Sequence, residues 1–101
     1  MSVTPVPGIN SIIATGGTAV VAVPANPNGG IITNPYTATD QGGIPLAEPL
    51  YVNPVGTAGT VGNGTTFRLE PGQSWEIIAG QTTQTTVNAV TSGHKFSVVY
   101  Y

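Results

Sequence analysis

Glycine and proline recur so often in this chain that they limit every element of regular structure to a few residues. The 101 residues include 14 Gly and 9 Pro, and no stretch keeps a helical hydrophobic period over about ten residues. Both residues weaken or end helices and strands. Between them lie short runs rich in β-branched and aromatic residues, a pattern typical of a β-sandwich or barrel. The sequence therefore predicts an all-β fold without a helix.

Alternation of apolar and polar residues predicts about eight short antiparallel strands in a compact sandwich. A Gly16-Gly17 turn is expected to join the first two strands as a hairpin, and Pro71-Gly72 suits a type II turn. In the C-terminal third, Trp75 shares one strand face with Ile77 and is expected in the core. The loop of residues 54–64 is glycine-rich and is expected to bury little. The predicted strands span residues 11–15, 18–23, 31–34, 49–53, 65–70, 74–79, 82–90 and 94–101.

The predicted domain organisation is a single β-sandwich domain over residues 11–101, preceded by an extended N-terminal arm over residues 1–10. Pro5 and Pro7 favour an extended conformation without strand pairing in this arm. A length of 101 residues leaves no room for a second domain of ordinary size.

Charge is the feature that most limits function. Only 6% of the residues are Asp, Glu, Lys or Arg, against about 25% in ordinary soluble domains. Two cationic side chains cannot neutralise several phosphates, so direct nucleic-acid binding and a polybasic membrane patch are both excluded. A nearly uncharged surface has little electrostatic repulsion and tends to associate, which favours a chain that works inside an assembly.

Catalytic and metal-binding side chains are scarce. There is no Cys and one His, whereas protein-bound zinc or iron usually needs three or four His, Cys or carboxylate ligands, so we predict no metal and no cofactor. His94 lies at a turn and is expected to make a local hydrogen bond or to face solvent. Glu70 and Glu76 could approach each other across a hairpin, with Arg68 and Lys95 nearby and a solvated ion pair as the ordinary explanation. A small enzyme would need at least two of Glu70, Glu76, His94 and Asp40 in an exposed cleft, so we predict that the protein is not an enzyme.

Several turn-and-strand patterns stand out in residues 14–20, 26–35, 48–52, 69–75, 87–89 and 93–96. Together these patterns resemble small head proteins of tailed bacteriophages. The resemblance covers nearly the whole chain, and its motifs carry no chemical signature. It implies a capsid decoration (cement) protein with a jelly-roll-like sandwich, which binds the outer face of the head as a dimer or trimer. Its expected partners are the major capsid protein and further copies of itself, and its expected location is the outer capsid surface of the virion.

The start of the chain has neither a basic region nor a long apolar run, so we expect synthesis in the host cytoplasm without a signal peptide and no membrane span. The residues expected to contact partners are apolar arm residues and tyrosines, because tyrosine combines a large apolar face with a polar tip. Two alternatives stay open: a carbohydrate-binding or adhesin-like module that uses exposed tyrosines, and a phage tail or spike component. The expected contact residues are Val3, Pro5, Val6, Pro7, Ile9, Tyr36, Tyr51 and Tyr101.

Overall fold

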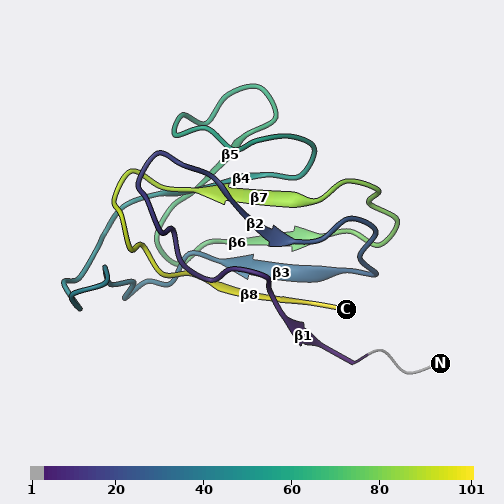
Figure 1. Ribbon diagram of the computed structural model, residues 1–101, viewed down its shortest axis with the longest axis horizontal. Coiled ribbons are helices and arrows are strands. Elements are labelled where there is room, and N and C mark those ends of the chain that lie inside the picture. The colour runs from purple at the N-terminus through teal and green to yellow at the C-terminus, as the bar shows by residue number, and fades with distance from the viewer. Residues whose placement is uncertain (1–3) are drawn as a thin grey trace.

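The computed structural model describes residues 4–101 and is all-β, with no helix among those residues (Figure 1). Its eight strands form two four-stranded sheets in which every pairing is antiparallel. This confirms the predicted fold class. The strands are β1 (Val6–Pro7), β2 (Val20–Val23), β3 (Gly30–Thr33), β4 (Leu50–Asn53), β5 (Phe67–Leu69), β6 (Ser74–Ile77), β7 (Thr85–Asn88) and β8 (Ser97–Tyr100).

The strand order identifies the sandwich as a jelly roll. One sheet has the order β1-β8-β3-β6 and the other β2-β7-β4-β5. Every connection except β4–β5 crosses from one sheet to the other, as Figure 1 shows. This is the double Greek-key arrangement of jelly rolls. Most strand partners are therefore distant in sequence.

The predicted hairpin around Gly16-Gly17 is wrong. Strand β2 pairs with β7, and residues 11–15 contribute only an isolated bridge between Ile12 and Lys95. Gly16 serves close packing instead, because a Cβ there would lie 2.1 Å from the Val90 carbonyl oxygen. The segment is held against the β7–β8 connection by the Gly17 amide, which donates to the Ala89 carbonyl at 2.8 Å.

The N-terminal arm takes part in the sandwich, contrary to the expectation that it lacks strand pairing. Val6 and Pro7 form β1, which pairs with β8. An edge strand tolerates Pro7, because the missing amide can face away from the sheet. The Gly8 amide donates to the β8 carbonyl of Val98 at 3.3 Å, and the Ile9 amide donates to the β2 carbonyl of Ala22 at 2.9 Å. Residues 8 and 9 thus join the two sheets along one side of the sandwich.

The core lies between the sheets and follows the predicted alternation in the C-terminal strands. Phe96 and Val98 are buried, whereas Val99 is 40% exposed. Ile77 is buried, and Trp75 packs half-buried against the same cluster. The buried cluster consists of Ile13, Ala22, Val23, Ile32, Leu50, Val52, Leu69, Ile77, Val87, Ala89, Phe96 and Val98.

The β4–β5 connection covers the outer face of the β2-β7-β4-β5 sheet, although it buries little of its own, as expected: within residues 54–64 only Ala58 is buried. Ala58 in this connection is 2% exposed. Its amide donates to Thr86 Oγ1 at 2.8 Å, and its carbonyl accepts from Asn88 Nδ2 at 2.9 Å. All residues of β4 and β7 are consequently buried. Figure 1 shows the connection looping over β4 and β5.

Candidate functional site

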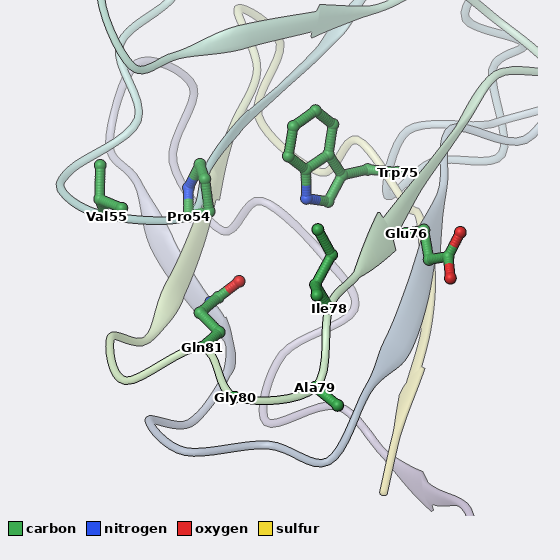
Figure 2. A pocket seen from close by; sticks show the side chains of 8 residues that line it. All are labelled: Pro54, Val55, Trp75, Glu76, Ile78, Ala79, Gly80 and Gln81. Atoms are coloured by element: carbon green, nitrogen blue, oxygen red, sulfur yellow. The ribbon is translucent and has the colours of Figure 1, made fainter.

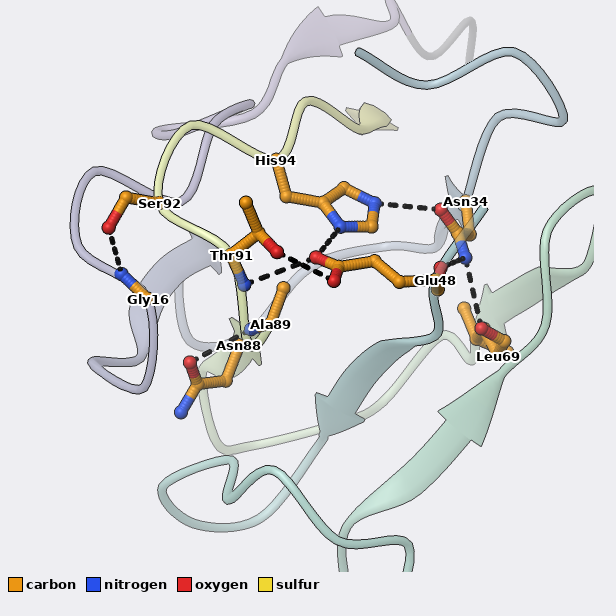
Figure 3. Close-up of polar contacts among 9 residues, drawn as sticks. All are labelled: Gly16, Asn34, Glu48, Leu69, Asn88, Ala89, Thr91, Ser92 and His94. Atoms are coloured by element: carbon orange, nitrogen blue, oxygen red, sulfur yellow. Dashed lines mark hydrogen bonds and ion pairs between the residues drawn. The ribbon is translucent and has the colours of Figure 1, made fainter. Parts of the chain in front are cut away.

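The one histidine lies at the centre of a buried polar cluster (Figure 3). His94 is fully buried. Its Nδ1 lies 2.9 Å from Glu48 Oε1, and its Nε2 lies 2.9 Å from Asn34 Oδ1. These partners are 46 and 60 residues away in the sequence. The expectation of a local hydrogen bond or a solvent-facing ring is therefore wrong.

Both atoms that face the imidazole are acceptors. The Asn34 side-chain amide donates to the carbonyls of Glu48 and Leu69, at 3.0 Å each, which turns Asn34 Oδ1 toward the ring. The Glu48 carboxylate can only accept when ionised. The imidazolium form of His94, which donates at both nitrogens, therefore satisfies the whole network.

Glu48 is ionised in this arrangement. Burial raises the pKa of its carboxyl group, but hydrogen bonds from His94 and Thr91, together with the charge of His94, outweigh burial and lower the pKa below its ordinary value. Thr91 donates its amide to Oε1 at 3.2 Å and its hydroxyl to Oε2 at 2.7 Å. Hydrogen bonding to the charged form favours ionisation in this way.

The cluster, which we call the His94 clasp (Asn34, Glu48, Thr91 and His94), is built to hold the sandwich together. It joins the β3–β4 connection, the end of β5 and the β7–β8 connection at one end of the molecule. A general base needs a ring nitrogen within reach of a substrate proton. His94 has both nitrogens bonded and no exposed surface, so its geometry is that of a structural group.

The remaining acidic side chains are separated. Glu70 forms the expected solvated ion pair with Arg68, at 2.5 Å and with both side chains about half exposed. Glu76 lies on β6 in the other sheet, so the expected hairpin between these segments is wrong. Asp40 Oδ1 accepts the amides of Gly42 and Ile44 within its own turn. Within residues 4–101, no three His, Cys, Asp or Glu side chains converge to hold a metal ion.

The outer face of the β1-β8-β3-β6 sheet is open, in contrast to the covered face of the other sheet. The strand register places Pro7, Val99, Ile31 and Glu76 in one row across the four strands. Ile31 is 43% exposed and Val99 40%, and Pro7 and Glu76 are exposed as well. We call this row and its surroundings the open face. It presents an apolar strip with a single carboxylate at its end.

Hydroxyl groups flank the apolar strip. The next outward row contains Ser97, Thr33 and Ser74, and the Thr33 and Ser74 hydroxyls are hydrogen-bonded to each other at 2.8 Å. Lys95 is exposed further along the chain before β8. The alternation in residues 94–101 already placed Val99 and Lys95 on one side, but nothing in the sequence indicated that this side is uncovered.

The residues expected to contact partners lie in different surroundings. Pro7 lies on the open face, and Tyr101, 41% exposed, follows β8 directly. Tyr51 is 6% exposed, because it lies on the sheet face that the β4–β5 connection covers, and the expectation that it is a surface residue is wrong. Val3 lies outside the described residues. The other exposed candidates are Pro5, Val6, Ile9 and Tyr36.

Comparison with models of protein families, with curated proteins and with solved structures gave no match. No helix long and apolar enough to cross a membrane occurs in the part of the chain that the structure describes. The resemblance to phage head proteins stays a prediction.

Proposed function

We propose that the protein is a non-enzymatic virion structural protein that decorates the outer face of a phage head. In this role it binds major capsid subunits and stabilises the contacts between them. The observation that carries the proposal is the open face: the chain covers the outer side of one sheet with its own β4–β5 connection and leaves an apolar strip on the other. Exposed apolar patches of this kind mark interaction sites.

The surface chemistry supports attachment to a large assembly. Four acidic and two basic side chains in 101 residues provide little repulsion between copies. A protein that binds only the assembled shell stabilises that shell by mass action. Attachment at several points of the lattice raises the overall affinity without new contacts. The predicted dimer or trimer would supply such multivalency.

One observation favours a second candidate, a carbohydrate-binding module. Tyr36 is 79% exposed beside a cleft of about 420 Å³ that Ala38, Pro45 and Leu46 also line. An exposed aromatic ring next to a shallow cleft suits stacking against a sugar. We rank the decoration role above the carbohydrate role, since the open face forms a row across all four strands of its sheet, whereas the cleft offers one exposed ring.

The experiment mixes the purified protein with capsid shells that lack it, and measures co-sedimentation and the melting temperature of the shells. We expect saturable binding and a raised melting temperature. Ile31→Asp should weaken binding by about tenfold or more, because it places a charge in the contact.

The matched control is Val61→Asp, which puts the same charge at a 61% exposed position in the β4–β5 connection. It should bind shells like the original protein. Absence of binding by the original protein would contradict the decoration role, and glycan-array binding that Tyr36→Ala abolishes would favour the carbohydrate module. Equal binding by Ile31→Asp and Val61→Asp would contradict attachment through the open face.

A further inference from the structure

A second surface feature lies where β4 and β6 leave the sandwich. A cleft of about 380 Å³ opens there between the start of the β4–β5 connection and the β6–β7 connection (Figure 2). Its walls are mainly apolar: Pro54 and Val55 on one side, and Ile78 and Ala79 on the other, with the Trp75 indole at its inner end. The walls favour an apolar occupant.

The Trp75 indole presents an unused hydrogen-bond donor. Its Nε1 is buried and is the one buried side-chain nitrogen or oxygen without a partner in the described part of the chain. The ring is held in place, because it lies 4.5 Å from the Phe67 ring, tilted by 30°, and its strand pairs with β3 at Ile32. A buried N–H without an acceptor is unfavourable, so a ligand that supplies an acceptor gains from this position.

One exposed side chain lies beside this donor. Figure 2 shows Ile78 next to the indole nitrogen, and Ile78 is 72% exposed. Rotamer changes of exposed side chains are fast. We therefore expect that rotation of the Ile78 side chain gives an acceptor access to the N–H without moving the sheet.

Gln81 supplies an acceptor on the opposite side of the cleft. Its Nε2 donates to the Thr83 carbonyl at 2.8 Å and to Thr85 Oγ1 at 2.7 Å. These two bonds fix the amide so that its oxygen turns toward the cleft, as Figure 2 shows. The cleft thus combines apolar walls with one donor and one acceptor.

We propose that this cleft binds an extended, uncharged peptide segment of a partner protein. A peptide group carries one carbonyl and one N–H, which complement the Trp75 indole and the Gln81 oxygen. Aliphatic side chains of the segment contact Pro54, Val55 and Ile78. The apolar walls disfavour an anionic segment, because a charge placed against them loses its hydration without gaining a partner.

The neighbouring strand supports an extended occupant. Within residues 4–101, β6 pairs on one side only, with β3, and its other edge is free. The strand leads directly into the cleft at Ile78. Free main-chain groups at a sheet edge can pair with an added strand, and adjacent pockets then select its side chains. The proposal is independent of the capsid role, since any partner with such a segment satisfies it.

Trp75 makes the test specific, because it is the one tryptophan of the chain. The probe is the tripeptide acetyl-Val-Thr-Val-amide, titrated while the single indole N–H resonance and the tryptophan emission are recorded. We expect a saturable downfield shift of the indole resonance, as a hydrogen bond forms. The acidic tripeptide acetyl-Asp-Thr-Asp-amide should produce no saturable shift.

Two variants locate the binding. Ile78→Asp should weaken binding of acetyl-Val-Thr-Val-amide by about tenfold or more, because it puts a charge in the apolar wall. Val61→Asp introduces the same charge at an exposed position outside the cleft and should bind like the original protein. The amide spectrum of each variant verifies its fold. The proposal would be overturned if acetyl-Val-Thr-Val-amide produced no saturable indole shift, or if Ile78→Asp and the original protein gave equal shifts. Either result is independent of whether the protein binds capsid shells.

Discussion

Glu48→Gln is the substitution that tests the His94 clasp most directly. The change keeps the size and shape of the side chain but replaces one carboxylate oxygen with an NH₂ group and removes the negative charge beside His94. Glu48 Oε1 accepts from His94 and from the Thr91 amide, and Oε2 accepts from the Thr91 hydroxyl. The substitution therefore weakens or removes each of these bonds.

The expected loss follows from the kinds of bond involved. A hydrogen bond to a charged group contributes about 1.5–3 kcal/mol and a neutral one about 0.5–1.5 kcal/mol. The bonds from His94 and the Thr91 hydroxyl are the short ones, at 2.9 and 2.7 Å. If each loses about 1 kcal/mol, the free energy of unfolding falls by about 2 kcal/mol. For a domain of this size the melting temperature then falls by roughly 8–16 °C.

The sign of the pH dependence provides an independent check. The pKa of Glu48 is lower in the folded protein than its ordinary value of 4.5. Ionised Glu48 therefore stabilises the fold fully above pH 4.5, and this contribution is lost as the pH falls through the lower folded pKa. The difference in unfolding free energy between the original protein and Glu48→Gln should shrink over that range, because protonated Glu48 resembles Gln.

Urea denaturation between about pH 2 and pH 7 measures both quantities. The matched control is Glu70→Gln, the same change in the exposed ion pair with Arg68, which should alter stability by no more than about 0.5 kcal/mol. The reasoning is refuted if Glu48→Gln costs no more than Glu70→Gln at neutral pH, or if its cost grows toward low pH.

Two further predictions concern the backbone of the sandwich. Gly16→Ala should lower the unfolding free energy by about 2 kcal/mol or more, because its Cβ would meet the Val90 carbonyl oxygen at 2.1 Å. Gly59→Ala, where nothing lies within 4 Å of the added Cβ, should change it by less than about 1 kcal/mol; similar melting curves for both variants would contradict the close-packing role. A chain that starts at Asn10 lacks β1 and the main-chain bonds of Gly8 and Ile9, so it should melt at a lower temperature and show faster amide exchange in β2 and β8. Unchanged exchange in those strands would contradict the idea that the segment joins the sheets.

The parts of the fold that could be predicted are those encoded by neighbouring residues. The alternation around Phe96, Val98 and Val99 identified β8 and its buried face. The Pro71-Gly72 pair marked a turn, which the structure contains with Gly72 at a φ of 90°. Such signals need only a few consecutive residues, because strand periodicity and turn chemistry are local.

The errors came from contacts between distant residues. The Gly16-Gly17 pair looked like a hairpin turn, but Val20 pairs with Val87, and in a jelly roll most neighbouring strands are far apart in the chain. His94 was assigned a local role because its partners, 46 and 60 residues away, leave no trace near it. The polar residues Thr86 and Asn88 within β7 were the available signal for the covering loop, since buried polar side chains need partners.

Strand β6 connects the two surfaces that we propose bind partners. Its residues alternate between the faces of the sheet, so Glu76 ends the row of the open face while Trp75, one residue earlier, points into the sandwich and lines the cleft. The opposite side is closed by residues 8 and 9, one end is held by the His94 clasp, and the second sheet is covered by its own loop. A partner that lies on the open face at β6 can therefore reach the cleft with a single extended segment. A binding site whose surroundings are already ordered loses less entropy when a partner binds. The contacts that hold the rest of the sandwich together therefore favour the proposed binding at β6.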